Sequence, residues 1–147
     1  MRHTGLAACL LCLGISACSA DKPATPTPVY PSVAGTYTGT ATFLTTAGNV
    51  TCAANTAVSQ AGRSVNLAAI QLGSECGVGT IPGGQFTIST TGALDIASTT
   101  FFDPGCDGTY SIAGSGGFFD REFRLTLTYT SSAPRCILRS FTTTMTR

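Results

Sequence analysis

The stretch GTYTGTATF (residues 35–43) alternates threonine with apolar or small residues at every second position. Successive side chains of a β-strand point to opposite faces, so this period of two places Tyr37, Ala41 and Phe43 on one face and the threonines on the other. Strands with one apolar face are typical of antiparallel sheets that bury one side and expose the other to solvent. The stretch therefore predicts a strand over residues 35–43 in an all-β protein.

The same alternation returns in REFRLTLTYT (residues 121–130), where Phe123, Leu125, Leu127 and Tyr129 share one face. Weaker strand patterns lie between and after these two stretches, over residues 50–59, 64–72, 85–90, 93–101, 107–113 and 136–146, with a further strand over 77–81 if that segment pairs. Short glycine- and proline-containing segments separate them, among them the run Gly114–Gly117. Connections this short allow antiparallel neighbours, so we expect a meander of about eight strands.

A meander of this size has to protect its two edge strands. It can do so by closing into a small barrel or by folding into a β-sandwich. We expect the small closed barrel, with the β-sandwich as the alternative. The composition, 43% hydrophobic and 10% charged, is that of an ordered domain.

The first residues have the parts of an export signal, with a basic start, an apolar run over residues 6–15 and small residues before a cysteine. The tetrapeptide Ile15-Ser16-Ala17-Cys18 resembles the lipobox of bacterial lipoproteins. That resemblance implies a signal peptide over residues 1–17 and a lipid, palmitate included, on Cys18. The alternative is a secreted protein that is cleaved after Ala20.

Residues 18–32 contain four prolines without an apolar period, which is typical of an extended flexible spacer before a β-barrel domain over 33–147. The lipobox resemblance implies a protein of the bacterial cell envelope whose membrane partner is reached through the lipid anchor. Ser19, rather than Asp, follows the cysteine, which resembles the enteric pattern for sorting to the outer membrane. The domain would then face the periplasm or the cell surface.

Four cysteines remain in the domain, namely Cys52, Cys76, Cys106 and Cys136. An even number in an exported domain indicates two disulfides, for which three connectivities are possible. A zinc site would need Cys-x-x-Cys pairs, and the sequence has none among these four. If residues 50–59 and 64–72 form a hairpin, Cys52 and Cys76 come out at the same end of the sheet. The same geometry favours the pair 106–136.

The two ends of the domain resemble the lipocalin and avidin (calycin) superfamily. That family begins its first strand with Gly-x-Trp and packs a terminal arginine over the indole at the closed end of an eight-stranded barrel. Here Gly35-Thr36-Tyr37 occupies the first position, with tyrosine in place of tryptophan. Arg139 and Arg147 are both candidates for the arginine.

The chemical inventory of the domain is narrow, because the only histidine is His3 in the leader and the only lysine is Lys22 in the spacer. Histidine- and lysine-dependent catalysis is therefore excluded from the folded part. Its six carboxylates fall mostly at expected turns or on outward faces, so we expect no enzyme, no cofactor and no metal site. From Cys18 onward the charges balance and form no basic face, which excludes nucleic acid as a partner.

Two function classes remain. In the first, the barrel binds a small apolar ligand; the candidate residues for that site are Tyr37, Phe43, Tyr110, Phe123, Leu125, Leu127 and Tyr129. In the second, the chain is a structural or interaction lipoprotein with a filled core and a threonine-rich outer face, whose protein partners the sequence does not specify. Eight-stranded barrels are either filled or hollow, so a cavity of a few hundred Å³ would separate the two.

Overall fold

The structure is a computed structural model that describes residues 25–147. The expected signal peptide, Cys18 and the first part of the spacer lie outside these residues. Within them the chain is all-β, as predicted, with a single turn of 3₁₀ helix, η1 (Ser74–Cys76). The strands are β1 (Gly35–Thr45), β2 (Gly48–Ala61), β3 (Ser64–Leu67), β4 (Ile70–Leu72), β5 (Thr80–Ile81), β6 (Gly84–Ile88), β7 (Leu94–Asp95), β8 (Thr99–Asp103), β9 (Gly108–Phe119), β10 (Glu122–Thr130) and β11 (Leu138–Thr146).

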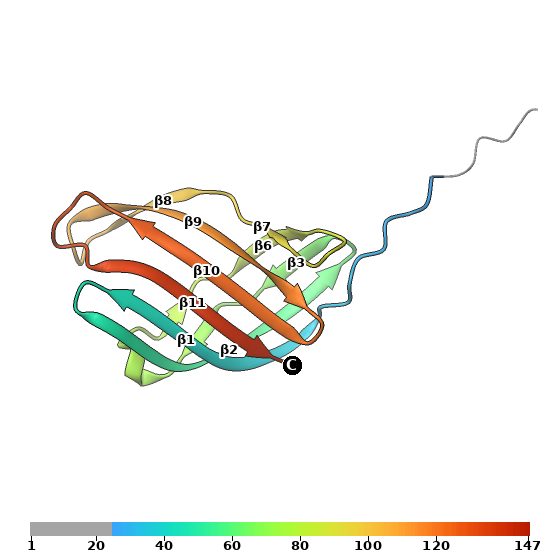
Figure 1. The fold of residues 1–147 in the computed structure, drawn as a ribbon, viewed down its shortest axis with the longest axis horizontal. Coiled ribbons are helices and arrows are strands. Elements are labelled where there is room, and N and C mark those ends of the chain that lie inside the picture. Colours follow the sequence, from blue (N-terminus) through green and yellow to red (C-terminus); the bar gives the residue numbers. More distant parts are fainter. Residues whose placement is uncertain (1–24) are drawn as a thin grey trace, which may run out of the picture.

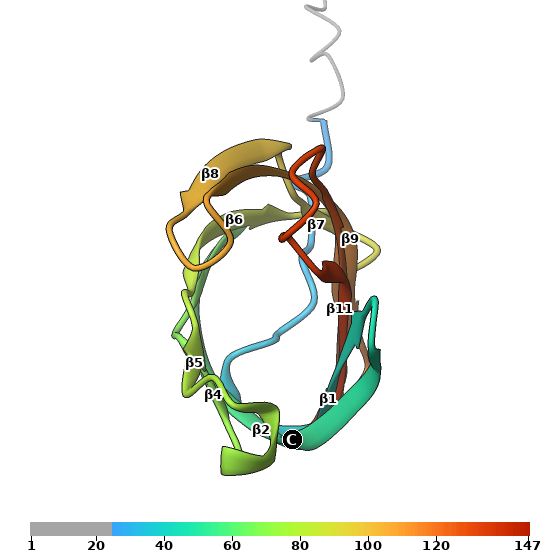
Figure 2. The same cartoon turned by 90° about the vertical axis from the view of Figure 1, so that its left-hand side faces the viewer.

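All strands belong to one antiparallel sheet, in the order β7-β6-β3-β2-β1-β11-β10-β9-β8, with β4 and β5 attached to β2. The meander returns on itself, because β11 pairs along β1 from Thr38–Thr146 to Thr45–Leu138. The sheet curls into an open half-barrel (Figure 1; Figure 2). Its two ends meet at a single bridge between Ala93 and Gly117, so the closed barrel expected from the sequence is only partly closed.

The eleven strands occupy eight positions around the half-barrel, which is the number predicted. Both β3 and β4 pair with β2, and the next position is shared by β5, which pairs with β4, and β6, which pairs with β3. In the same way β8 pairs along the first half of β9, while the residue preceding β7 bridges to its second half. Two of the expected strands, 64–72 and 93–101, are thus each interrupted once, and the expected segment 77–81 pairs as β5.

The glycine run Gly114–Gly117 corrects one expectation, because it continues strand β9 where the sequence predicted a turn. A Cβ atom on Gly114 would lie 2.6 Å from a side-chain carbon of Leu127 on β10. One on Gly117 would lie 2.7 Å from the carbonyl oxygen of Gly92. The glycines therefore allow leucine side chains to cover β9 and allow the chain before β7 to approach it closely.

Both disulfides have the predicted pairing. Cys52–Cys76 joins β2 to η1, and Cys106–Cys136 joins the β8–β9 turn to the β10–β11 loop. The β8–β9 turn and the β10–β11 loop lie at the end of the half-barrel opposite the one at which the N-terminal segment enters (Figure 1). The second disulfide therefore fastens the β8–β9 turn to the β10–β11 loop, whereas the first ties η1 to Cys52, which pairs with Ala41 inside the β1–β2 ladder.

Candidate functional site

The end of the half-barrel where the chain enters is closed by Tyr37 and Arg147. The Tyr37 ring is fully buried, and its hydroxyl donates to the carbonyl oxygen of Val33 at 2.8 Å. The Arg147 guanidinium lies 6.0 Å from the centre of that ring and donates to the carbonyl oxygens of Ala34 at 2.7 Å and Ser32 at 3.0 Å. Of the two candidate arginines, Arg147 therefore occupies the position over the aromatic ring, and Arg139 is exposed on β11.

Gln60, near the end of β2, holds the segment that precedes β1. Its side-chain oxygen accepts from the backbone N–H of Val33 at 2.8 Å, and its amide nitrogen donates to the carbonyl oxygen of Pro31 at 2.9 Å. Val33 itself is only 1% exposed. The last residues of the expected spacer are consequently bound to the domain, so the folded unit begins slightly before residue 33.

The seven residues proposed for a ligand site all face the interior, where they mostly pack on one another. Six are buried and Leu127 is half-buried. Tyr37 lies 5.5 Å from Phe118 and 6.2 Å from Phe123 between ring centres. At the far end Tyr110 and Tyr129 meet edge to face at 5.9 Å. These aromatic side chains therefore fill the interior more than they line an empty space.

Sequence reasoning missed three members of this core. Phe118 stacks on Phe123 at 4.9 Å, Phe141 packs against Phe43 at 5.0 Å, and Met145 is fully buried. Phe141, Thr143 and Met145 follow one another at every second position on the inward face of β11. The period of two within residues 136–146 was the signal that could have found Phe141 and Met145.

Tyr37 and Tyr129 carry no charge at neutral pH. Burial raises the pKa of Tyr37, an effect that the positive charge of Arg147 partly offsets. Burial also raises the pKa of Tyr129 to about 12. Both phenols thus stay neutral, and the aromatic core behaves as an apolar medium.

A partly enclosed space lies among side chains of the interior, and we call it the apolar hollow. It has a volume of about 60 Å³. Its lining residues are all apolar: Leu67, Ile70, Ile81, Pro82, Phe86, Leu94, Ile96, Leu125 and Leu127. Of the seven residues proposed for a ligand, only Leu125 and Leu127 reach it. Pockets for small molecules typically measure roughly 300–1,000 Å³, so this hollow has room for little more than one apolar side chain.

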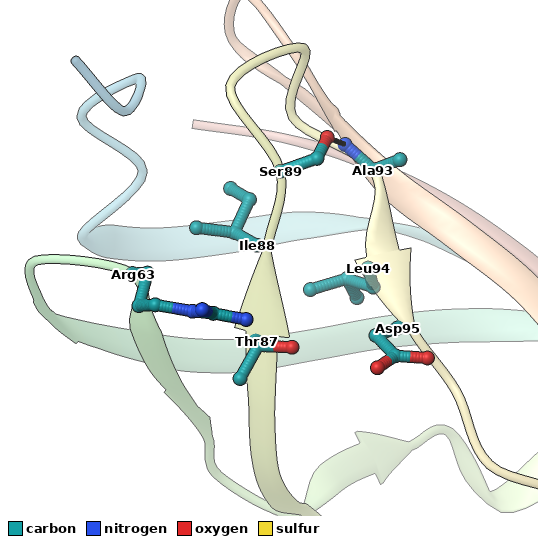
Figure 3. A pocket seen from close by; sticks show the side chains of 7 residues that line it. All are labelled: Arg63, Thr87, Ile88, Ser89, Ala93, Leu94 and Asp95. Carbon is teal, nitrogen blue, oxygen red and sulfur yellow. Dashed lines mark hydrogen bonds between the residues drawn. The ribbon is translucent and has the colours of Figure 1, made fainter. Parts of the chain in front are cut away.

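A second pocket, of about 250 Å³ and lined by both polar and apolar side chains, lies at the surface on the β6–β7 hairpin and is open to solvent (Figure 3). Arg63 reaches toward Thr87 from the turn between β2 and β3, and Asp95 lies on the other side of Thr87 (Figure 3). The Ser89 hydroxyl accepts from the backbone N–H of Ala93 at 3.0 Å, so it stabilises the hairpin turn. The charged groups that line the pocket are the exposed guanidinium of Arg63 and the exposed carboxylate of Asp95, and none of the polar residues that line it is buried.

Two carboxylates of the domain make local interactions. Asp103 accepts from the backbone N–H of Gly105 at 2.8 Å within its turn, and Glu122 pairs with Arg124 on the same strand. Over residues 25–147 no group of three or more His, Cys, Asp or Glu side chains is placed to hold a metal ion.

The outer face carries a set of threonines on three neighbouring strands, and we call it the threonine face. Thr40 on β1 pairs with Thr144 on β11, and Thr142 pairs with both Thr42 and Thr126. The remaining members are Thr36, Thr38, Thr128, Thr130 and Thr146. The face therefore presents hydroxyl and methyl groups with few charges.

Over residues 25–147 the structure has no helix that is long and apolar enough to cross a membrane. Comparisons with protein-family models, curated proteins and solved structures gave no match for this chain. The fold and the site thus define a small antiparallel half-barrel with a largely filled interior.

Proposed function

We propose that this chain is a lipid-anchored protein of the bacterial cell envelope that acts as a structural or interaction module with a filled core. The observation that carries the proposal is the occupancy of the interior. Aromatic side chains of the chain itself fill both ends, and the apolar hollow measures only about 60 Å³. What the protein presents to its surroundings is then its outer surface, including the threonine face.

The entry point of the chain supports an anchor on the N-terminal side. Residues 31–34 are fixed by Gln60 and Arg147 at one end of the half-barrel. A tether from Cys18 would therefore pull on that end, and the far end with the β8–β9 turn and the β10–β11 loop would point away from the membrane. The proposed location is the outer membrane, facing the periplasm or the cell surface.

The anchor is tested by replacing Cys18. The Cys18→Ala variant is expected to lose palmitate incorporation completely and to leave the membrane fraction or remain unprocessed, because the thiol is the attachment point of the lipid. Cys12→Ala, which changes a cysteine inside the leader, should be labelled like the wild type. Palmitate labelling that persists in Cys18→Ala would refute the proposed anchor.

A second candidate function is a carrier of a small apolar ligand, which the wholly apolar lining of the hollow favours. Ala41 distinguishes the two, since it is 1% exposed on the inward face of β1. With a filled core, Ala41→Leu should cost about 1–3 kcal/mol of unfolding free energy through overpacking. The melting temperature should fall by several degrees, and the wild type should not bind an apolar fluorescent probe stoichiometrically.

The matched control is Ala57→Leu, which adds the same group on the exposed face of β2 and should leave the melting temperature within about a degree. The carrier function would be supported instead by two results together. These are saturable one-to-one probe binding by the wild type, and loss of that binding in Ala41→Leu at an unchanged melting temperature.

A further inference from the structure

Residues 25–29 form an exposed segment in front of the half-barrel, and we call this segment the stalk. Every one of its residues is exposed, and Val29, the last of them, is 83% exposed (Figure 1). Contact with the folded unit begins directly afterwards. Tyr30 is half-buried against the core, and the carbonyl oxygen of Pro31 accepts from Gln60. The stalk is therefore the part of the described chain that another protein can reach from all sides.

The stalk has the repeating sequence Thr25-Pro26-Thr27-Pro28. Proline has no backbone N–H and a fixed φ angle, and it keeps the residue before it extended. Both threonines are thus held on an extended, polyproline-like backbone with their hydroxyls in solvent. Threonine and serine interspersed with proline are typical of stalks that carry O-linked sugars.

The other threonines of residues 25–147 lie on the strands of the sheet or in the connections between them. Thr36 and Thr38 on β1 are also exposed, but they pair with Ala57 and Asn55 on β2. An enzyme that encloses the acceptor backbone would have to open this pairing, which costs the free energy of local unfolding. The stalk can enter such an active site without any loss of strand pairing.

Ser32 is the remaining hydroxyl residue in front of β1. It is exposed, but its carbonyl oxygen accepts from the Arg147 guanidinium at 3.0 Å, so its backbone is fixed against the half-barrel. Thr25 and Thr27 are consequently the hydroxyl acceptors that combine exposure with a free backbone.

We propose that Thr25 and Thr27 are O-glycosylation sites that receive a neutral hexose from a transferase. The threonine Oγ1 attacks C1 of a sugar that is activated by a phosphate on that carbon. The C1–Oγ1 bond forms and the bond from C1 to the phosphate oxygen breaks. The phosphate leaves with the bonding electron pair, and the hydroxyl proton passes to a base of the transferase.

A neutral sugar fits the chemistry of the stalk. Residues 25–29 carry no charged side chain, so they offer no cation that would pair with an acidic sugar or a phosphate group. The inference deepens the proposed function by giving the interaction module a sugar-bearing stalk, and it rests on that function only for the export of the chain. Palmitate labelling tests the anchor, whereas the sugar is measured separately by mass and remains measurable on a chain released from the membrane.

The test is mass spectrometry of the mature chain isolated from the cells in which it naturally occurs. The proteolytic peptide that contains the stalk should exceed its sequence mass by whole hexose units. Electron-transfer fragmentation should place these units on Thr25 and Thr27. The double variant Thr25→Val/Thr27→Val keeps the shape of both side chains and both prolines but lacks the hydroxyls, so its stalk peptide should lose the added mass completely.

The matched control is Thr36→Val/Thr38→Val, which removes two exposed hydroxyls from the paired strand β1. Its stalk peptide should carry the same hexose units as that of the wild type. A stain for periodate-oxidised sugars on the intact protein gives an independent readout. It should mark the wild type and the control variant but not Thr25→Val/Thr27→Val.

Three outcomes would overturn the assignment of the two sites. The first is a wild-type stalk peptide whose mass equals that of its sequence. The second is added hexose that persists in Thr25→Val/Thr27→Val, or that fragmentation places on strand residues such as Thr36. The third is an added mass that corresponds to phosphate, which would identify the threonines as phosphorylation sites instead.

Discussion

Replacing Tyr37 by alanine is expected to lower the free energy of unfolding by about 3–5 kcal/mol, the usual cost of truncating a buried aromatic side chain. The ring packs against Phe118 and Phe123 and beneath Arg147, so its removal leaves a cavity with rigid walls. Small domains are stable by about 5–15 kcal/mol, and the loss is therefore a large part of the total. Urea denaturation monitored by circular dichroism measures it.

Tyr37→Phe separates the ring from its hydroxyl. This variant keeps the packing and loses only the hydrogen bond to the carbonyl oxygen of Val33, so it should cost about 1 kcal/mol. If Tyr37→Ala and Tyr37→Phe destabilised the protein equally, the aromatic cluster at the chain entry would not contribute the stability that we assign to it.

Removing the Cys106–Cys136 disulfide should produce the second large effect. The bond closes a loop with a sequence separation of 30 residues, and in the chain-entropy model loops of this size contribute about 3–4 kcal/mol. Cys136 is fully buried and Cys106 is 7% exposed, so their replacement by alanine also leaves unfilled space. The double variant Cys106→Ala/Cys136→Ala is compared with the wild type by chemical denaturation without reductant.

The double variant Cys52→Ala/Cys76→Ala serves as the comparison. Its loop has a similar separation of 24 residues, but Cys76 is only half-buried, so a smaller loss is expected. Peptide mapping of the unreduced protein checks the pairing itself. A crossed linkage such as Cys52–Cys136 would contradict the strand order.

The parts of the fold that follow from local alternation could be predicted. Strands β1 and β10 extend close to the ranges expected from GTYTGTATF and REFRLTLTYT, because one face of each is buried and the other is solvated. The disulfide pairing followed from hairpin geometry, which depends only on neighbouring strands. These features need no knowledge of how distant segments pack.

The remaining features depend on contacts between distant segments. Gly117 belongs to β9 through its pairing with Arg124 of β10, but the close approach of Gly92 and Ala93 to it comes from a distant segment, and nothing near Gly117 in the sequence indicates that approach. The choice of Arg147 over Arg139 follows from the register, in which Thr146 pairs with Thr38 near the start of β1. The apolar hollow is the space left between side chains from several strands. Its volume depends on how these side chains pack, and the alternation within a single strand does not indicate that packing.

The pairing of β1 with β11 has a consequence for how the chain acquires its structure. The Thr143 hydroxyl donates to the carbonyl oxygen of Thr40 across a separation of 103 residues, whereas each disulfide joins cysteines only 24 or 30 residues apart. Contacts of high sequence separation make folding slow, on the order of milliseconds to seconds. The two segments that each contain one disulfide can thus form early, whereas the edge of β1 stays unpaired until β11 pairs with it. In that interval the chain exposes an unpaired strand, so in the envelope location proposed above, assistance by a periplasmic chaperone would raise its yield more than its final stability.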